Sequence, residues 1–127
     1  MAPKHRLRPS PSERFAGPEH RIELASALDA LRKEPHEGKD GHRQITVFRK
    51  GPLRLVLFAF EAGGTLPAHR APGLVVIHVL RGTVSVRTPS ETHDLTAGRI
   101  LVLDPEVGHD VKAHEQADML LTISVVP

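Results

Sequence analysis

The chain has 127 residues, of which 39% are hydrophobic and 25% charged, enough for one folded domain with a core. It has no cysteine, tryptophan or tyrosine, which excludes disulfides and thiolate sites and argues against base stacking on nucleic acid. No apolar run approaches the roughly 18 residues that span a bilayer, and no signal-peptide segment is present. We therefore expect a cytoplasmic protein that binds neither nucleic acid nor membrane.

The N-terminal residues 1–17 are rich in proline, serine and arginine and have no apolar periodicity. Five basic and only two acidic residues fall within residues 1–21, so this end of the chain is positively charged. Such a composition cannot bury enough apolar surface to fold alone. We predict that residues 1–17 form a disordered basic arm.

An amphipathic helix is predicted over residues 18–34. Pro18 suits a first helical turn, and Pro35 ends the pattern. Apolar residues recur at about every third position, which places them on one helix face, at Ile22, Ala25, Leu28 and Leu31. We expect this face to dock on a sheet or a partner subunit.

From residue 36 onward the pattern changes to short runs with an apolar repeat of two, separated by glycine and proline turns. Runs of this length and spacing are typical of an antiparallel sandwich or barrel. Residues 36–127 are therefore expected to form a single all-β domain. The predicted strands are 44–49, 53–60, 74–80, 83–88, 92–95, 99–103, 107–113 and 118–126.

Two groups of residues in this region have a characteristic spacing. In the first, five residues separate Gly63 from His69, and Gly82 ends the group. In the second, Gly98 precedes His109. Fifteen residues separate the two groups.

In this spacing the chain resembles the cupin family over about residues 42–126. It looks most like the small single-domain bacterial cupins, which have a loop similar to HRAPG at 69–73 and a closing strand similar to LLT at 120–122. The resemblance implies a small jelly-roll β-barrel, preceded here by one helix, with a site inside one mouth of the barrel.

The family also implies a divalent ion held by three histidines and a glutamate, and here the chain departs from the motif. The second histidine is replaced by Ala71 and the glutamate by Val75. In the second group the proline, glycine and asparagine positions hold Asp104, Glu106 and Ala113. A mononuclear site usually needs three protein ligands. We therefore expect no metal or other cofactor; if a divalent ion binds, His69 and His109 are its ligands.

The ligand-binding site expected from the resemblance is a pocket where the two histidines meet apolar side chains. Paired imidazoles can exchange hydrogen bonds with a ligand, act as an acid–base pair, or only satisfy loop carbonyls. Side-chain alternation along a strand places Val75 toward the interior and His78 away from it. The predicted lining residues are His69, His109, Val75, Ile77, Val79, Leu101 and Leu103.

The sequence leaves several functions open. The first is a small-molecule-binding cupin of unknown ligand, without a competent metal site. The second is a metal-dependent cupin oxygenase or isomerase in which another residue binds the metal ion together with His69 and His109. The third is a sensory or regulatory module that acts with a partner protein. In each case we expect a homodimer, because residues 53–60 and 74–80 are apolar on both strand faces.

Overall fold

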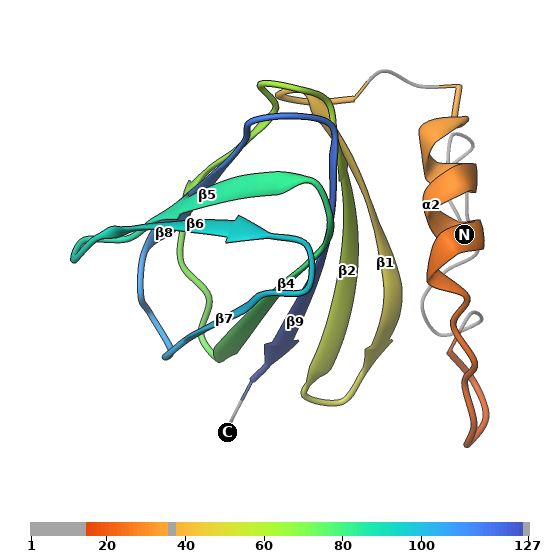
Figure 1. Ribbon diagram of the computed structural model, residues 1–127. Coiled ribbons are helices and arrows are strands. Elements are labelled where there is room, and N and C mark those ends of the chain that lie inside the picture. The colour runs from red at the N-terminus through yellow and green to blue at the C-terminus, as the bar shows by residue number, and fades with distance from the viewer. Residues whose placement is uncertain (1–14, 36–37, 126–127) are drawn as a thin grey trace.

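The computed structural model describes residues 15–35 and 38–125. One helix precedes an array of antiparallel strands (Figure 1). The helix is α2 (Leu24–Arg32), and the strands are β1 (His42–Lys50), β2 (Leu53–Phe60), β3 (Thr65–His69), β4 (Leu74–Arg81), β5 (Thr83–Arg87), β6 (Thr92–Thr96), β7 (Ile100–Leu103), β8 (His109–Ala113) and β9 (Ala117–Ser124).

The strands form two facing sheets. The larger has the order β1-β2-β9-β4-β7, and the smaller has the order β3-β8-β5-β6. Neighbours in space are often distant in the sequence, as where β9 pairs with both β2 and β4. This two-sheet arrangement is the jelly roll that the sequence predicts.

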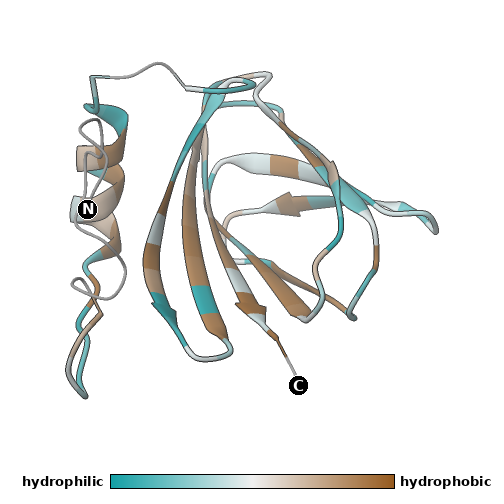
Figure 2. Ribbon diagram, turned by 180° about the vertical axis from the view of Figure 1, so that it is seen from behind, coloured by the Kyte–Doolittle hydropathy of each residue, from teal (hydrophilic) through white to brown (hydrophobic). Residues whose placement is uncertain are grey.

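The core lies between the sheets and follows from side-chain alternation. On β4, Val75, Ile77 and Val79 are at most 2% exposed, whereas the residues between them are more accessible. Hydrophobic residues run along the strands, and hydrophilic residues gather at several turns (Figure 2). The other strands contribute Val56, Phe58, Phe60, Val84, Val86, Leu95, Leu103, Val111, Ala113, Ala117, Met119 and Leu121.

The turn between β4 and β5 requires a glycine. Gly82 has a φ of +81°, a left-handed conformation that disfavours other residues. A Cβ at this position would stand 2.5 Å from the Gln116 carbonyl oxygen. This turn lets the chain leave the larger sheet on β4 and enter the smaller one on β5.

The helix is shorter than predicted. It begins at Leu24 rather than at residue 18, and the residue before it, Glu23, is extended. The chain ahead of it is instead held on β1, where the His20 ring packs edge-on against Phe48 at 4.9 Å between centroids. Lys50 Nζ donates to the Gly17 carbonyl oxygen at 2.6 Å. Tertiary contacts therefore override the helical apolar spacing in this segment.

Part of the predicted disordered arm is ordered. Phe15 is only 8% exposed, and its ring lies 5.4 Å from that of Phe48. An aromatic ring can bury a large apolar area on a strand even within a polar segment. The prediction was therefore wrong for residues 15–17, and residues 1–14 lie outside the described residues.

Helix α2 covers the outer side of the larger sheet at β1 and β2 (Figure 1). Leu57 faces away from the barrel interior, yet it is fully buried. Leu31, the innermost residue of the helix, is 1% exposed. Burial of such a side chain stabilises the fold by about 1.5–3 kcal/mol. The predicted docking of the helix on a sheet is thus confirmed.

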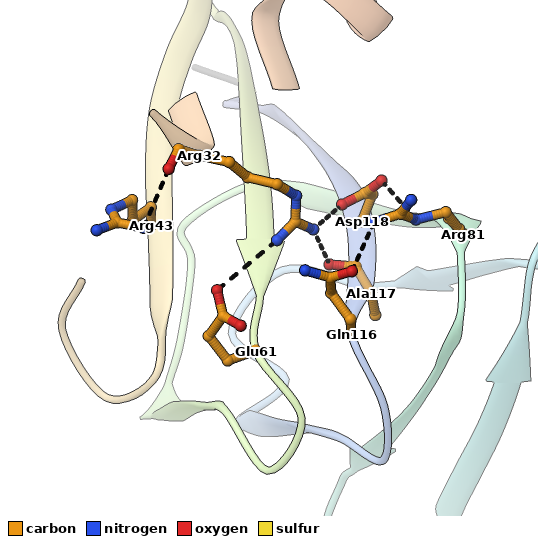
Figure 3. A network of polar contacts seen from close by, with 7 residues as sticks. All are labelled: Arg32, Arg43, Glu61, Arg81, Gln116, Ala117 and Asp118. Carbon is orange, nitrogen blue, oxygen red and sulfur yellow. Dashed lines mark hydrogen bonds and ion pairs between the residues drawn. The ribbon is translucent and has the colours of Figure 1, made fainter. Parts of the chain in front are cut away.

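A network of charged groups joins the end of the helix to the barrel (Figure 3). Asp118 of β9 is 6% exposed and contacts Arg32 of α2 through one carboxylate oxygen. Arg81 of β4 lies 3.2 Å from the other oxygen. Arg32 also donates to the Ala117 carbonyl oxygen at 3.3 Å and lies 3.8 Å from Glu61. One buried carboxylate thus connects the helix with two strands of the larger sheet.

In the part of the chain that the structure describes, no helix is long and apolar enough to cross a membrane.

Candidate functional site

The central feature of the candidate site is a β-bulge in β3, which is not among the strands predicted from the sequence. Leu66 pairs with Val111 of β8, but the next paired residue is His69, opposite His109. One extra residue is therefore accommodated around Pro67, which has no N–H to donate to a ladder. β3 is an edge strand, where proline is tolerated.

The bulge brings the two predicted histidines together. Without it, Leu66 and Ala68 would share the inner face and His69 would point outward. With it, His69 and His109 are cross-strand partners, and their ring centroids are 4.2 Å apart at an angle of 60°. The prediction that these two imidazoles converge is confirmed.

Hydrogen bonds to the backbone determine which nitrogen of each ring carries the proton. His69 Nδ1–H donates to the Pro67 carbonyl oxygen at 2.9 Å, and His109 Nδ1–H donates to the Val107 carbonyl oxygen at 3.1 Å. A carbonyl oxygen only accepts, so Nδ1 must be protonated in both rings. In a neutral ring, Nε2 then presents a lone pair.

The Nε2 atom of His109 is buried and has no hydrogen-bond partner within the described structure. The whole residue is only 2% exposed. Leaving such a group unsatisfied costs about 1–3 kcal/mol. The structure therefore contains an acceptor that a donor from a bound molecule can satisfy.

His109 is held in its neutral form. Burial lowers its pKa below the usual 6.5, and His69 beside it acts in the same direction. The hydrogen bond to Val107 and the carboxylate of Asp110 oppose this lowering. Desolvation outweighs them because a charged imidazolium is poorly solvated in this position.

A hollow of about 380 Å³ opens beside the histidine pair. It lies where the bulged end of β3 meets the start of β8 and the end of β5. Its wall is formed by Ala68, His69, Arg70, Arg87, Thr88, Pro89, Gly108, His109 and Asp110.

The predicted aliphatic lining lies elsewhere. Val75, Ile77, Val79 and Leu103 belong to the packed core, and Leu101 packs against it. None of them is on the wall of this hollow. Polar and charged residues, above all Arg70 and Arg87, replace them there. The sequence did not predict Arg70 and Arg87 at the site, because the pairing of the strands and the bulge in β3 determine which side chains lie beside the histidines.

The metal that the family motif implies does not fit these residues. Two imidazoles offer bare Nε2 atoms, but the other two motif positions hold Ala71 and Val75, both buried and without donor atoms. Within the described residues, no cluster of three or more histidine, aspartate or glutamate side chains could hold an ion. Two ligands fall short of the three protein ligands usual for a mononuclear site.

The other histidines of the barrel have different surroundings. His78 lies on the outer side of β4, as predicted, between the inward-facing Ile77 and Val79. His42 is buried, but both its nitrogens have polar neighbours: Nδ1–H donates to the Thr65 carbonyl oxygen at 2.8 Å, and Nε2 lies 3.0 Å from the side-chain amide of Gln44. His42 is therefore structural, in contrast to His109.

The lowered pKa of His109 predicts how stability depends on pH. The unfolded chain binds a proton near pH 6.5, whereas folded His109 binds it only at lower pH. Between these values the unfolded state holds more protons, so the free energy of unfolding rises with pH. The contribution of neutral His109 to the free energy of unfolding is complete above pH 6.5. It is lost as the pH falls toward and through the pKa of the folded state.

Urea unfolding between about pH 5 and pH 7.5 measures this dependence. We expect His109→Gln to have a flatter profile than the unmodified protein, because the group with the lowered pKa is then absent. Equal slopes for His109→Gln and the unmodified protein would contradict the burial argument.

Comparison with known proteins agrees with this architecture. The cupin domain model matches residues 56–126. A conserved protein of unknown function from Streptococcus pyogenes superposes with a TM-score of 0.70 at 20% identity, covering 89% of this chain and 95% of the other. An RmlC-like cupin from Shewanella frigidimarina superposes with a TM-score of 0.65 at 21% identity, covering 71% of this chain and 81% of the other.

A protein of unknown function from Rhizobium leguminosarum gives a TM-score of 0.67 at 20% identity, covering 87% of this chain and 100% of the other. No curated protein matches the chain. Identities this low show a common fold only. The family match extends over more than half of the sequence, and the chain therefore belongs to the cupin domain family.

Proposed function

We propose that this cupin binds a small molecule in the hollow beside His69 and His109, without a tightly held metal ion. The observation that supports this most is the Nε2 atom of His109, a residue that lines the hollow: this atom is buried and has no partner among the described residues. Buried acceptors in folded proteins are nearly always paired. A ligand with an O–H or N–H group supplies the missing donor.

The shape of the site favours binding. Concave sites with a few convergent polar groups are the usual positions for small ligands. Here the bulge places His69 opposite His109 beside the hollow. Gly108 contributes no side chain, so the hollow stays open. The two imidazoles are rigidly oriented by their backbone hydrogen bonds, so little freedom is lost on binding.

A fragment screen followed by NMR of the histidine rings tests the proposal. Compounds of several classes, including acids, alcohols, amides and heterocycles, are added to the full chain. We expect hits that shift the ring nitrogens of His69 and His109 and raise the melting temperature. Hits that leave both rings unchanged would contradict the proposal.

A blocking variant separates binding in the hollow from binding elsewhere. A Cβ at Gly108 would be 3.9 Å from its nearest neighbour, the Arg70 side chain, so substitution is sterically acceptable. Gly108→Leu should fill the hollow, retain the fold and abolish the hits. Thr96→Leu, on exposed surface away from the hollow, is the control and should bind normally.

We also propose that the protein is a homodimer that buries the outer face of β4 and β7. Leu74, Ile100 and Val102 are exposed there by 38%, 56% and 57%. Ile100 stands beside His78, which pairs with Leu120 on its other side. A second copy presents the same apolar face, so a two-fold contact covers both at once.

Light scattering at micromolar concentration should give the mass of a dimer. Val102→Lys should produce a folded monomer, because a charge in the centre of the contact is costly to bury. Ser90→Lys, on the exposed turn between β5 and β6 of the smaller sheet, should remain dimeric. A monomeric unmodified protein would remove the proposal.

A further inference from the structure

The hollow has a net positive lining. Arg87 is paired with Asp110, donating from Nε at 3.0 Å and from Nη2 at 2.7 Å to the same carboxylate oxygen. Arg70 has no hydrogen bond or ion pair among the described residues. One guanidinium in the wall is therefore left without a counter-charge.

The position of Arg70 relates it to His109. Its Cγ and Nε lie over Gly108, each 3.9 Å from the point where a Cβ of that residue would stand. Gly108 immediately precedes His109, and all three residues form part of the same wall. A residue with a fork of N–H donors and a residue with an unsatisfied acceptor thus line the same hollow.

These two groups require different features of a ligand. A guanidinium binds a planar carboxylate by paired charge-assisted hydrogen bonds. His109 Nε2 can only accept, so the second feature must be a donor. An ammonium donor would be disfavoured by the positive charge of Arg70, which favours a neutral donor, and a hydroxyl group is the smallest of these.

We propose that the hollow selects a small hydroxycarboxylate, with its carboxylate on Arg70 and its hydroxyl group donating to Nε2 of His109. This inference rests on the proposed function, since it names the chemical class of ligand for the same site. It places the ligand across Gly108, with its charged end toward Arg70 and its hydroxyl end against the histidine pair.

A matched series of four-carbon probes tests the inference: 2-hydroxybutyrate, butyrate, 2-hydroxybutyramide and 2-aminobutyrate. Their dissociation constants are measured by NMR titration of the full chain, with both enantiomers of each chiral probe. We expect 2-hydroxybutyrate to bind most tightly. Loss of the carboxylate or of the hydroxyl group should each weaken binding, on the order of tenfold for the charged contact.

Two variants assign the two contacts. Arg70→Gln should abolish the preference for the acid over the amide while binding of the amide persists. His109→Phe, which keeps a ring but has no acceptor nitrogen, should abolish the preference for 2-hydroxybutyrate over butyrate. Arg99→Gln, an exposed arginine outside the hollow, should bind all four probes as the unmodified protein does.

Each other outcome overturns the inference in a recognisable way. Equal binding of the amide and the acid with shifts at the His109 ring would overturn the ligand class and leave the proposed function standing. Tightest binding of 2-aminobutyrate would show that the donor is an ammonium group. Absence of binding by all four probes would also overturn the ligand class. Binding that leaves the His69 and His109 rings unchanged would contradict both the inference and the proposed function.

Discussion

Replacing Ala71 by histidine and Val75 by glutamate in one variant should create a metal site that takes up about one divalent ion per chain. These are the two positions where the cupin motif has ligands and this chain has aliphatic residues. Val75 faces the barrel interior, and both residues are buried. The Ala71 carbonyl oxygen accepts from the Glu106 N–H at 2.9 Å, which ties its loop to the loop that leads into His109.

The new side chains should join two histidines whose Nε2 atoms are already bare. Binding should weaken as the pH falls, because histidine ligands must be deprotonated to coordinate. In chelator the variant should be less stable than the unmodified protein, since the buried glutamate then has no partner. Added zinc or nickel should restore its stability.

Metal analysis after purification and calorimetric titration measure this effect. The control pairs Ala71→His with Val76→Glu, which places the carboxylate on the outer face of the same strand and should bind weakly. Stoichiometric metal in the unmodified protein, lost in His69→Ala, would show that another residue completes a native site. A folded double variant that takes up no metal would show that Ala71 and Val75 do not share the space of the histidine pair.

The second large effect is expected at Asp118. Asp118→Ala should lower the free energy of unfolding by about 2–4 kcal/mol, because removal of one partner from a buried ion pair leaves the other charge uncompensated. Arg32, whose side chain is only 20% exposed, would lose its main partner at the end of the helix. Arg81 is 57% exposed and can be rehydrated, which moderates the cost.

Urea unfolding measures the loss, and an exposed pair supplies the matched control. Asp29 and Lys33 form an ion pair within the same helix at 2.9 Å, with side chains 67% and 74% exposed. Asp29→Ala should change stability by less than about 0.5 kcal/mol. If Asp118→Ala is as mild as Asp29→Ala, the network in Figure 3 does not hold the helix on the barrel.

Much of the fold could be predicted from apolar periodicity. Alternation along β4 correctly separates the inward Val75, Ile77 and Val79 from the outward His78. Periodicity failed where a tertiary contact competes with it. The helical apolar spacing includes Ile22, but ring contacts of Phe15 and His20 with Phe48 accompany a chain that is not helical before Leu24.

The site could be predicted only in part. Motif spacing identified His69 and His109, because glycine turns and histidines recur at fixed separations. The direction of His69 depends on a bulge at Pro67, and residues 65–69 are not among the strands predicted from the sequence. Arg70 follows this bulge and was missed for the same reason, since a one-residue change in register moves a side chain to the other face.

We propose that His109 presents a neutral Nε2 without a proton to a ligand. The ring nitrogen chemical shifts of this residue across a pH titration test this most directly. We expect His109 to carry its proton on Nδ1 at pH 7, to have an unprotonated Nε2, and to have a pKa below the usual 6.5. A proton on Nε2 at neutral pH, or a pKa of His109 above 6.5, would contradict it.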